Sequence, residues 1–314
     1  MTREHAICEV CASNTNALEA SGWDFEYATS REEFQIVHCL KCNLLYLADR
    51  PTIENTHLIY PQNYYSYDES SSQNRLIKKI REKLEYNKVR IFIRLLGNET
   101  RWVLDIGCGD GRLLNTFTIH CPSTWNLTGI EINENAAKKA KTKGYEVLTG
   151  DFEFKELEWN KKFDLILMHQ VLEHTRSPRQ VVQKVSKLLK PGGLFSIETP
   201  DTKSWDRKLF GKKYWGGYHI PRHFYLFDKE NISHLLNEEG FEIISCKSML
   251  SPVFWILSIH NYLIDHQKYR LARFFHYQNP LLLIITSIID LIQTIFFSQS
   301  SNMQIIAKRK YDSK

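Results

Sequence analysis

Hydrophobic and polar positions in the middle of the chain alternate between two repeating patterns. Short apolar runs such as "WVLDIG" (102–107) and "FDLILMHQ" (163–170) have the length and composition of buried strands. Between such runs, segments such as "NENAAKKAKTKG" (133–144) carry apolar residues at helical spacing, and Gly144 is expected to end that helix. This alternation predicts an α/β fold built on a doubly wound, Rossmann-like parallel sheet.

The pattern continues toward the C-terminus and divides the chain into four parts. A helix is predicted after Ser177, which is expected to cap it, with Pro178 in its first turn and Pro-Gly-Gly (191–193) as its stop. Strands are predicted at 241–249 and 302–310. The predicted parts are an N-terminal unit (1–50), a linker with an amphipathic basic helix (51–100), a sheet domain (101–252 and 299–314) and a helical insertion (253–298).

Composition and the N-terminal sequence indicate in which compartment of the cell the protein is expected. The 314 residues are 43% hydrophobic and 25% charged, which is an ordinary composition for a soluble protein. The first ten residues, "MTREHAICEV", are too polar for a secretory signal or a transit peptide. We therefore expect a cytoplasmic protein in which cysteines stay reduced, so that paired cysteines favour a metal over disulfides.

Four of the seven cysteines form two Cys-x2-Cys pairs near the N-terminus. Cys8, Cys11, Cys39 and Cys42 have the spacing of two zinc knuckles, although four free buried thiols would give the same sequence. Four thiolates leave no open coordination position, so the predicted zinc is structural. Without it, some 45 residues could not bury enough core to fold.

Positive charge is concentrated in one segment. Residues 75–94 hold eight basic and two acidic residues, an excess larger than the net +5 of the whole chain. A solvated helix face is the simpler interpretation. The alternative is contact with an anionic substrate, a lipid surface or nucleic acid.

A glycine-rich turn follows the first strand of the sheet domain. Gly107, Gly109 and Gly111 allow the backbone to approach a ligand closely, and the helix behind them offers free N–H groups to it. The spacing GxGxG differs from the GxGxxG of dehydrogenases. Glu131 and Asp151 end the next two strands, where carboxylates can accept from ribose hydroxyls and an adenine amino group.

Together these segments carry a family resemblance over residues 101–249. The motifs "VLDIGCGDG", "GIEIN", "GDFE", "FDLILMHQVLEH" and "LKPGGLFSIETP" stand in the order found in class I S-adenosylmethionine-dependent methyltransferases, which this region resembles. The resemblance implies a seven-stranded sheet whose last two strands are antiparallel, with S-adenosylmethionine as cofactor. The implied cofactor-binding residues are Asp105, Gly107, Cys108, Gly109, Gly111, Glu131, Ile132, Asp151, Phe152 and His169.

Methyl transfer to oxygen or carbon requires that the protein align the acceptor and remove its proton. Relatives that methylate amides or adenine carry an Asn/Asp-Pro-Pro-Tyr/Phe motif, which residues 168–171 lack. Histidine suits a base near neutral pH, and the candidates are His169, His219 and His223. His174 is expected to be part of the scaffold. The aromatic loop 214–227 is either an acceptor pocket or a lid on the sheet edge.

The N-terminal unit indicates which group of methyltransferases the chain resembles. The paired Cys-x2-Cys motifs and the tyrosine-rich stretch Pro61, Tyr64, Tyr65 and Tyr67 make the chain similar to sugar C-methyltransferases and related enzymes, although their long second C-terminal domain is missing. We therefore expect a small-molecule, sugar or lipid-linked acceptor. A zinc-containing RNA methyltransferase and a non-catalytic binding protein are the alternatives. Nucleic acid is disfavoured because no second basic patch is present.

The insertion contains "PLLLIITSIIDLIQTIFF" (280–297), which has the length of a membrane span. Asp290 at its middle would cost about 2.5–3.5 kcal/mol in a lone span. Its polar residues recur as a narrow stripe: Thr286, Ser287, Asp290, Gln293 and Thr294. One interpretation is a helical pair that covers the sheet edge or seals a homodimer. The other is a peripheral contact with the inner face of the membrane, which would bring the site to an amphiphilic acceptor.

Overall fold

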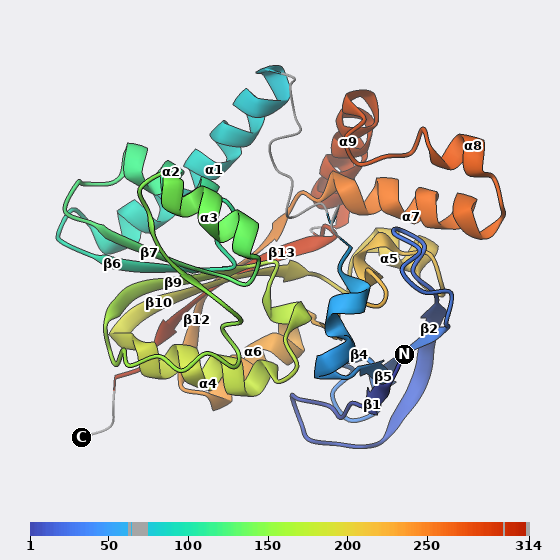
Figure 1. Ribbon diagram of the computed structural model, residues 1–314, viewed down its shortest axis with the longest axis horizontal. Coiled ribbons are helices and arrows are strands. Elements are labelled where there is room, and N and C mark those ends of the chain that lie inside the picture. Colours follow the sequence, from blue (N-terminus) through green and yellow to red (C-terminus); the bar gives the residue numbers. More distant parts are fainter. Residues whose placement is uncertain (62–63, 65–74, 298, 312–314) are drawn as a thin grey trace.

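A twisted sheet of seven strands forms the centre of the molecule (Figure 1). The computed structural model describes residues 1–61, 64, 75–297 and 299–311, so Tyr65 and Tyr67 lie outside it, as do the side chains of 75–78, 80 and 81. The strands are β6 (Trp102–Ile106), β7 (Asn126–Glu131), β8 (Glu146–Thr149), β9 (Phe163–His169), β10 (Leu189–Pro200), β12 (Phe241–Met249) and β13 (Asn302–Arg309).

The order of the strands confirms the predicted fold class. They lie side by side as β12-β13-β10-β9-β6-β7-β8. The pairs from β10 to β8 are parallel, whereas β13 is antiparallel to both β10 and β12. The direction of winding reverses between β6 and β9, and ligands of open sheets bind at such a point, beyond the carboxyl ends of the strands.

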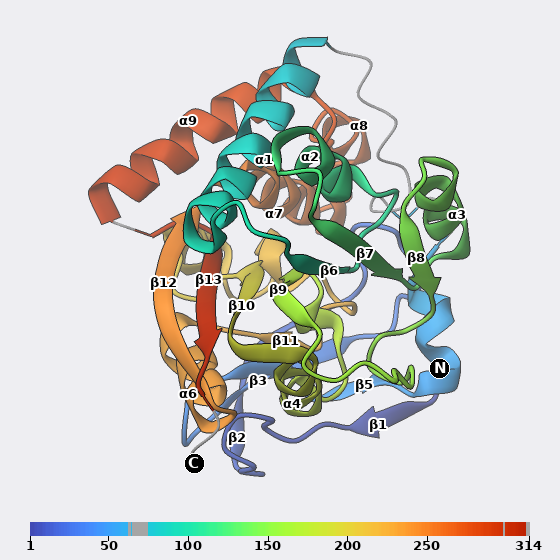
Figure 2. The ribbon, with the colours of Figure 1, turned by 90° about the vertical axis from the view of Figure 1, so that its left-hand side faces the viewer.

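Helices cover both faces of this sheet (Figures 1 and 2). One face carries α1 (Arg75–Leu96), α2 (Arg112–His120) and α3 (Glu134–Thr142), and the other carries α4 (Pro178–Leu188) and α6 (Lys229–Glu238). The N-termini of α3 and α6 are each capped by the side chain of the residue that directly precedes the helix. Asn133 accepts from the N–H of Ala136, and Asp228 forms a reciprocal capping box with Asn231.

Two details of α4 differ from the sequence-based expectation. Ser177 does stand at the N-cap, but its side chain makes no capping hydrogen bond. The Glu153 carboxylate accepts from the N–H groups of Arg176 and Ser177 instead, so a residue distant in sequence caps this helix. The helix ends at Leu188, before Pro-Gly-Gly, which lies within β10 where the pairing register shifts.

The N-terminal unit folds as short strands that pack onto the sheet domain. It contains β1 (Arg3–His5), β2 (Asn16–Gly22), β3 (Phe34–Cys39), β4 (Leu45–Leu47), β5 (Asp49–Pro51) and the 3-10 helix η1 (Ile53–Ile59). Its largest sheet has the order β11-β4-β3-β2, and β11 (Tyr225–Leu226) comes from the sheet domain. Buried apolar side chains of the N-terminal unit and of the sheet domain also form one continuous core. The unit is therefore joined to the domain by a shared strand and a shared core.

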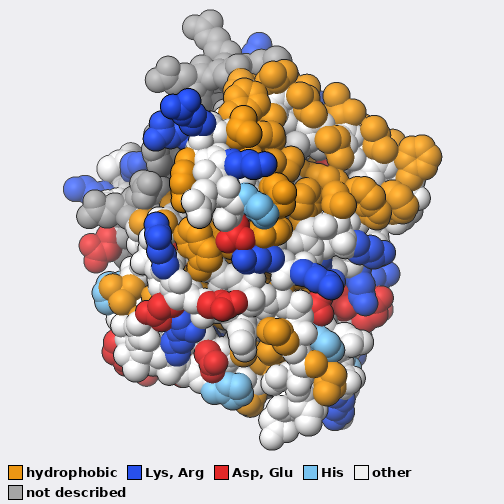
Figure 3. All heavy atoms as spheres, turned by 90° about the vertical axis from the view of Figure 1, so that its right-hand side faces the viewer, with side chains coloured by type: hydrophobic (Ala, Val, Ile, Leu, Met, Phe, Trp, Pro, Cys, Tyr) orange, Lys and Arg blue, Asp and Glu red, His pale blue; other side chains and the backbone are white. Residues whose placement is uncertain are grey.

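The insertion consists of three helices: α7 (Pro252–Asp265), α8 (Tyr269–Ala272) and α9 (Pro280–Phe297). Within the described residues, α9 is the one helix whose length and composition would suffice to cross a membrane. Most of its apolar side chains point outward, whereas Leu282 is buried, and hydrophobic side chains gather over the upper part of the face shown in Figure 3. The exposed residues, called the α9 face below, are Leu281, Ile284, Ile285, Ile288, Ile289, Leu291, Ile292, Ile295, Phe296 and Phe297.

Candidate active site

The glycine-rich turn joins β6 to α2 and has the backbone that its sequence predicts. Gly107, Gly109 and Gly111 all have positive φ angles, of 77°, 55° and 82°. A Cβ atom on Gly107 would lie 2.5 Å from a methyl group of Val171, so that position requires glycine. A Cβ on Gly109 would meet nothing within 4 Å, which means that the backbone is open there. The turn can therefore hold a ligand against the start of α2.

Glu131 is fixed beside this turn at the end of β7. Its carboxylate oxygens accept from the N–H groups of Gly109 and Asn133, each at 2.8 Å. Burial raises the pKa of Glu131, while these backbone N–H groups oppose the rise. The side chain is thus held where a ribose diol can donate to it, as the resemblance implies.

The remaining residues implied for the cofactor lie around the same strand ends. Ile132 is 59% exposed directly after Glu131, an unusual position for a large apolar side chain and a suitable one for an adenine ring. Asp151 follows β8, and burial raises the pKa of its carboxyl group. Phe152 is buried. Cys108 packs toward β7, since a Cβ on Gly129 would lie 2.5 Å from its sulfur. Ile132 and Asp151 thus stand at strand ends beside the turn, and the assignment of these residues to the cofactor stays a prediction.

His169 lies in a buried polar cluster at the end of β9. Its Nε2 is 3.1 Å from the Ser196 hydroxyl, and its Nδ1 is 3.6 Å from Glu198 on the neighbouring strand. Glu198 also pairs with Lys88 of α1 at 2.6 Å. Burial lowers the pKa of His169 to about 4, so the ring is neutral near pH 7. These contacts connect His169 to α1, whereas the other two candidate bases lie in a different cluster.

His219 stands at the centre of that second cluster. Its Nδ1 is 2.8 Å from the Glu26 carboxylate and its Nε2 is 3.0 Å from the Tyr64 hydroxyl. A neutral ring then donates from Nδ1 to Glu26 and accepts at Nε2 from the tyrosine. His219 also has φ 42°, a strained backbone conformation for a non-glycine residue that is frequent at functional sites. Carboxylate, imidazole and phenol thus form a line of hydrogen bonds.

Two further histidines adjoin His219. The ring of His174, in the 3-10 helix η4 (Leu172–His174), lies 4.6 Å from that of His223, measured between centroids. The Nδ1 atom of His223 lies 2.8 Å from the carbonyl oxygen of Gly217, which can only accept, so this Nδ1 carries the proton. The Nδ1 atom of His174 lies 3.1 Å from the carbonyl oxygen of Arg222 and 3.2 Å from the Tyr60 hydroxyl, which can donate or accept. Burial lowers the pKa of His174 to about 3 and that of His223 well below its usual value.

Glu173 completes this group and is fully buried. Burial raises the pKa of its carboxyl group to about 8. Glu173, His174 and His223 present ligand-type atoms within 4.8 Å of one another. Near pH 7 the three side chains are therefore neutral, since the acid keeps its proton and both rings lack a second one. Val171, which contacts Gly107, precedes η4, so this cluster stands next to the glycine-rich turn.

A small pocket with room for about one water molecule opens beside His219. It is lined by Trp23, Phe25, Glu26, Lys213, Trp215, Tyr218, His219, Ile220 and Asn261. The N-terminal unit, the loop 214–227 and α7 all contribute to this lining. The aromatic loop thus lines this small pocket, and its role as an acceptor pocket stays a prediction.

The loop 214–227 is fastened to the N-terminal unit by a buried ion pair. Both Nη atoms of Arg222 contact the Asp24 carboxylate, at 3.1 and 2.6 Å, and neither residue has exposed surface. No pattern in the sequence singles out Asp24, Glu26 or Glu173. The only hint is that the first two are acids within an aromatic stretch between the cysteine pairs, "WDFEY" (23–27).

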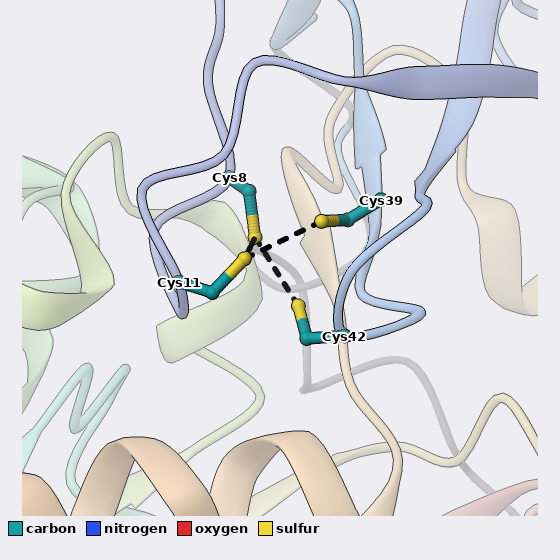
Figure 4. Close-up of side chains that lie close together, drawn as sticks. All are labelled: Cys8, Cys11, Cys39 and Cys42. Atoms are coloured by element: carbon teal, nitrogen blue, oxygen red, sulfur yellow. Dashed lines mark hydrogen bonds between the residues drawn. The ribbon is translucent and has the colours of Figure 1, made fainter.

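The four predicted metal ligands meet in one place. Cys8, Cys11, Cys39 and Cys42 point toward one another from two separate turns (Figure 4). Their Sγ atoms are 3.4–3.6 Å apart in the contacting pairs, far from the ~2.05 Å of a disulfide. A tetrahedral zinc ion with Zn–S bonds of about 2.3 Å needs S–S edges of about 3.8 Å. The sulfurs fit zinc closely.

The backbones of the two cysteine turns are alike. In each turn the residue after the second cysteine has a positive φ, 55° for Ala12 and 60° for Asn43. In each, that residue donates its N–H to the carbonyl of the first cysteine at 2.9 Å. Two matching turns therefore direct four thiols to one point.

Comparisons with known proteins agree with this geometry. Residues 75–246, more than half of the chain, match the family described as "Methyltransferase domain". A ubiquinone biosynthesis O-methyltransferase from Paracidovorax citrulli is 31% identical over 131 residues, which are 39% of this chain and 53% of that protein. The chain thus spans about half the length of this relative. One from Bordetella avium is 28% identical over 187 residues, 54% of this chain and 76% of that protein.

Among solved structures, the fold is similar to that of a putative sarcosine dimethylglycine methyltransferase from Galdieria sulphuraria. The TM-score is 0.51 with 13% identity, and the match covers 78% of this chain and 91% of that one. At this identity the likeness concerns the fold alone.

Proposed function

Because the chain belongs to the class I S-adenosylmethionine-dependent methyltransferase family, we propose that it moves a methyl group from S-adenosylmethionine to an oxygen or carbon atom of a small-molecule, sugar or lipid-linked acceptor. The relatives named O-methyltransferase favour oxygen. Bound S-adenosylmethionine supplies an activated methyl group on a sulfonium leaving group, so the protein's part is to align the acceptor and take its proton.

The cofactor would be held by the strand ends around the glycine-rich turn. Glu131 would accept from the ribose hydroxyls, and Asp151 from the adenine amino group. Ile132 offers an exposed apolar surface to the adenine ring. The open backbone at Gly109 leaves room for the rest of the molecule beside the start of α2.

His219 is the strongest candidate for the base. The observation that supports it is the line of hydrogen bonds from Glu26 through His219 to Tyr64, next to the pocket. A carboxylate on Nδ1 orients the imidazole and stabilises the ring once it is protonated, as in hydrolase triads. Nε2 can then take the acceptor's proton directly, or through the Tyr64 hydroxyl if the phenol passes on its own proton.

The other two histidines receive different roles. His223 has its free Nε2 in the same cluster, so it is the second candidate base, but its lowered pKa makes it a weaker one. His169 is enclosed by Ser196 and Glu198. We assign it to positioning the end of β9 beside the cofactor.

Zinc at the four cysteines would act on this chemistry indirectly. The cysteine turns adjoin one end of the β2–β3 pair, where Asn16 faces Cys39, and the segment that carries Asp24 and Glu26 joins the two strands at the opposite end. The metal would therefore fasten the base of the strand pair whose far end delivers Glu26 to His219. Its own four sulfur ligands leave it no position for a substrate.

The proposal is tested by incubating the full-length protein with methyl-labelled S-adenosylmethionine and fractionated extracts. We expect label in an acceptor, and a fall of about 10²-fold or more in His219→Ala with cofactor affinity intact. His234→Ala, on the exposed side of α6, is the matched control and should keep the wild-type rate. Unchanged turnover in His219→Ala would overturn the assignment of the base, and cofactor binding without transfer to any fraction would favour a binding protein.

A further inference from the structure

Helix α9 turns its polar side chains toward the protein and its apolar side chains toward the outside. This is the reverse of the usual arrangement for a helix on a water-exposed protein surface. Its polar stripe faces the protein, where Thr286, Asp290 and Gln293 are buried. Its outward residues are all apolar, including Ile295 with 66% and Phe296 with 75% of their surface exposed. Fully burying one such side chain is worth about 1.5–3 kcal/mol relative to leaving it in water. The α9 face therefore suits an apolar phase outside the protein.

The inward orientation is fixed by specific hydrogen bonds. The Asp290 carboxylate accepts from the N–H of Ser251, just before α7, and from the hydroxyl of Ser300, just before β13. Thr286 and Thr294 bond back to carbonyls of their own helix. Turning the helix by half a turn would expose these groups to an apolar phase and break the contacts of Asp290, so the α9 face remains outward.

The same contacts exclude a transmembrane arrangement. Asn302, five positions after Phe297 at the end of α9, already pairs in the central sheet with Pro200 and Met249. Both ends of α9 thus belong to one folded body on one side of any bilayer. The helix can lie along a membrane surface but cannot cross it.

Positive charge accompanies the apolar surface. Between His266 and Ile289 the chain has three basic residues, Lys268, Arg270 and Arg273, all exposed, and no acidic one. In Figures 1 and 2, which differ by a turn about the vertical axis, α1 also rises at the same upper end of the molecule as α8 and α9. Its exposed Lys79 and Lys83 add to the charge at that end.

We propose that the α9 face, with the flanking cations of α8 and α1, docks the protein peripherally on an anionic membrane surface. Ten adjacent apolar side chains without a polar group match hydrocarbon, whereas protein interfaces carry about one hydrogen bond per 100–200 Å². Exposed cations beside such a face match anionic headgroups. A second copy of the chain as the occupant is an outcome of the test below.

Docking would bring the membrane close to the candidate site, because the insertion contributes to both. Ser258 of α7 accepts from the N–H of Gly216 at 2.8 Å, and Asn261 of α7 lines the pocket. This proposal rests on the orientation of α9 and the surrounding charge, and it stands independently of the proposed reaction.

Flotation of the full-length protein with vesicles of phosphatidylcholine alone, or with phosphatidylglycerol added, tests the proposal. We expect binding to the anionic vesicles that weakens with added salt. Ile288→Gln with Ile295→Gln should lower the partition coefficient at least about tenfold. The matched control is Leu18→Gln with Ile119→Gln, which removes apolar side chains of similar exposure from β2 and α2 and should bind like wild type.

Three results would overturn the proposal. The first is that the wild-type protein stays in the soluble fraction. The second is that flotation falls equally in both double variants. The third is a lipid-independent dimer, seen by light scattering, that dissociates in Ile288→Gln with Ile295→Gln, since a second copy would then cover the α9 face.

Discussion

At the scale of single residues, buried charges join the N-terminal unit to the sheet domain. Arg222 pairs with Asp24 through two hydrogen bonds and donates from Nε to the carbonyl of Ile59 at 2.8 Å. Three segments far apart in sequence meet at this one guanidinium. Since His219 and His223 flank Arg222 in the same loop, the ion pair also fixes the position of the candidate base relative to Glu26.

Removing one partner of this pair should therefore destabilise the protein strongly. Arg222→Ala leaves the Asp24 carboxylate buried and unpaired, and we expect the free energy of unfolding to fall by about 3–5 kcal/mol. Urea unfolding followed by circular dichroism measures it. Lys143→Ala, which removes a more exposed ion pair with Asp110, should cost less than about 1 kcal/mol. Equal losses in the two variants would contradict the anchoring role.

The buried carboxyl group of Glu173 should make the stability of the protein depend on pH. Burial raises the pKa of its carboxyl group from an ordinary 4.5 to about 8. Between these values the unfolded chain releases this proton while the folded chain keeps it, so the group's contribution to stability is present below about pH 4.5 and is lost as the pH rises through 8. Glu173→Gln imitates the neutral acid without titrating.

The variant should thus match wild type near pH 4.5 and exceed it at pH 8, by on the order of a few kcal/mol. Thermal unfolding across this pH range measures the difference, with Glu134→Gln, on the exposed side of α3, as the control. Parallel profiles for Glu173→Gln and wild type would show that the carboxyl group is already ionised in the fold.

At the scale of elements, the N-terminal unit acts through what its strands carry. β11 pairs with β4, and the segment between β2 and β3 holds Asp24 and Glu26. Loss of the metal should loosen the strand pair that carries this segment without touching the glycine-rich turn. The unit is therefore expected to matter for methyl transfer more than for cofactor binding.

Cys39→Ser tests this expectation. We predict loss of one zinc per chain by metal analysis, faster proteolysis within residues 1–60, and reduced methyl transfer at nearly unchanged affinity for S-adenosylmethionine. Cys121→Ser changes a cysteine at the end of α2 and should retain the metal. Full zinc retention in Cys39→Ser would refute the assignment of the ligands.

Over the whole molecule, local patterns predicted the fold and the implied cofactor residues, because strands, turns and the acids that end them are adjacent in sequence. The meeting of Glu26 with His219 could not be predicted in this way, since it depends on how the N-terminal unit docks. Periodicity likewise revealed the polar stripe around Asp290, but only the contacts with Ser251 and Ser300 determine which side faces the protein.

The central claim, a cofactor site built on the turn and Glu131, is tested most directly by calorimetric titration with S-adenosylmethionine. We expect wild type to bind one equivalent, and Glu131→Ala to bind more weakly by about 1.5–3 kcal/mol because a charged hydrogen-bond acceptor is lost. His219→Ala should bind like wild type. Absence of binding by the wild-type protein, or equally tight binding by Glu131→Ala, would contradict the claim.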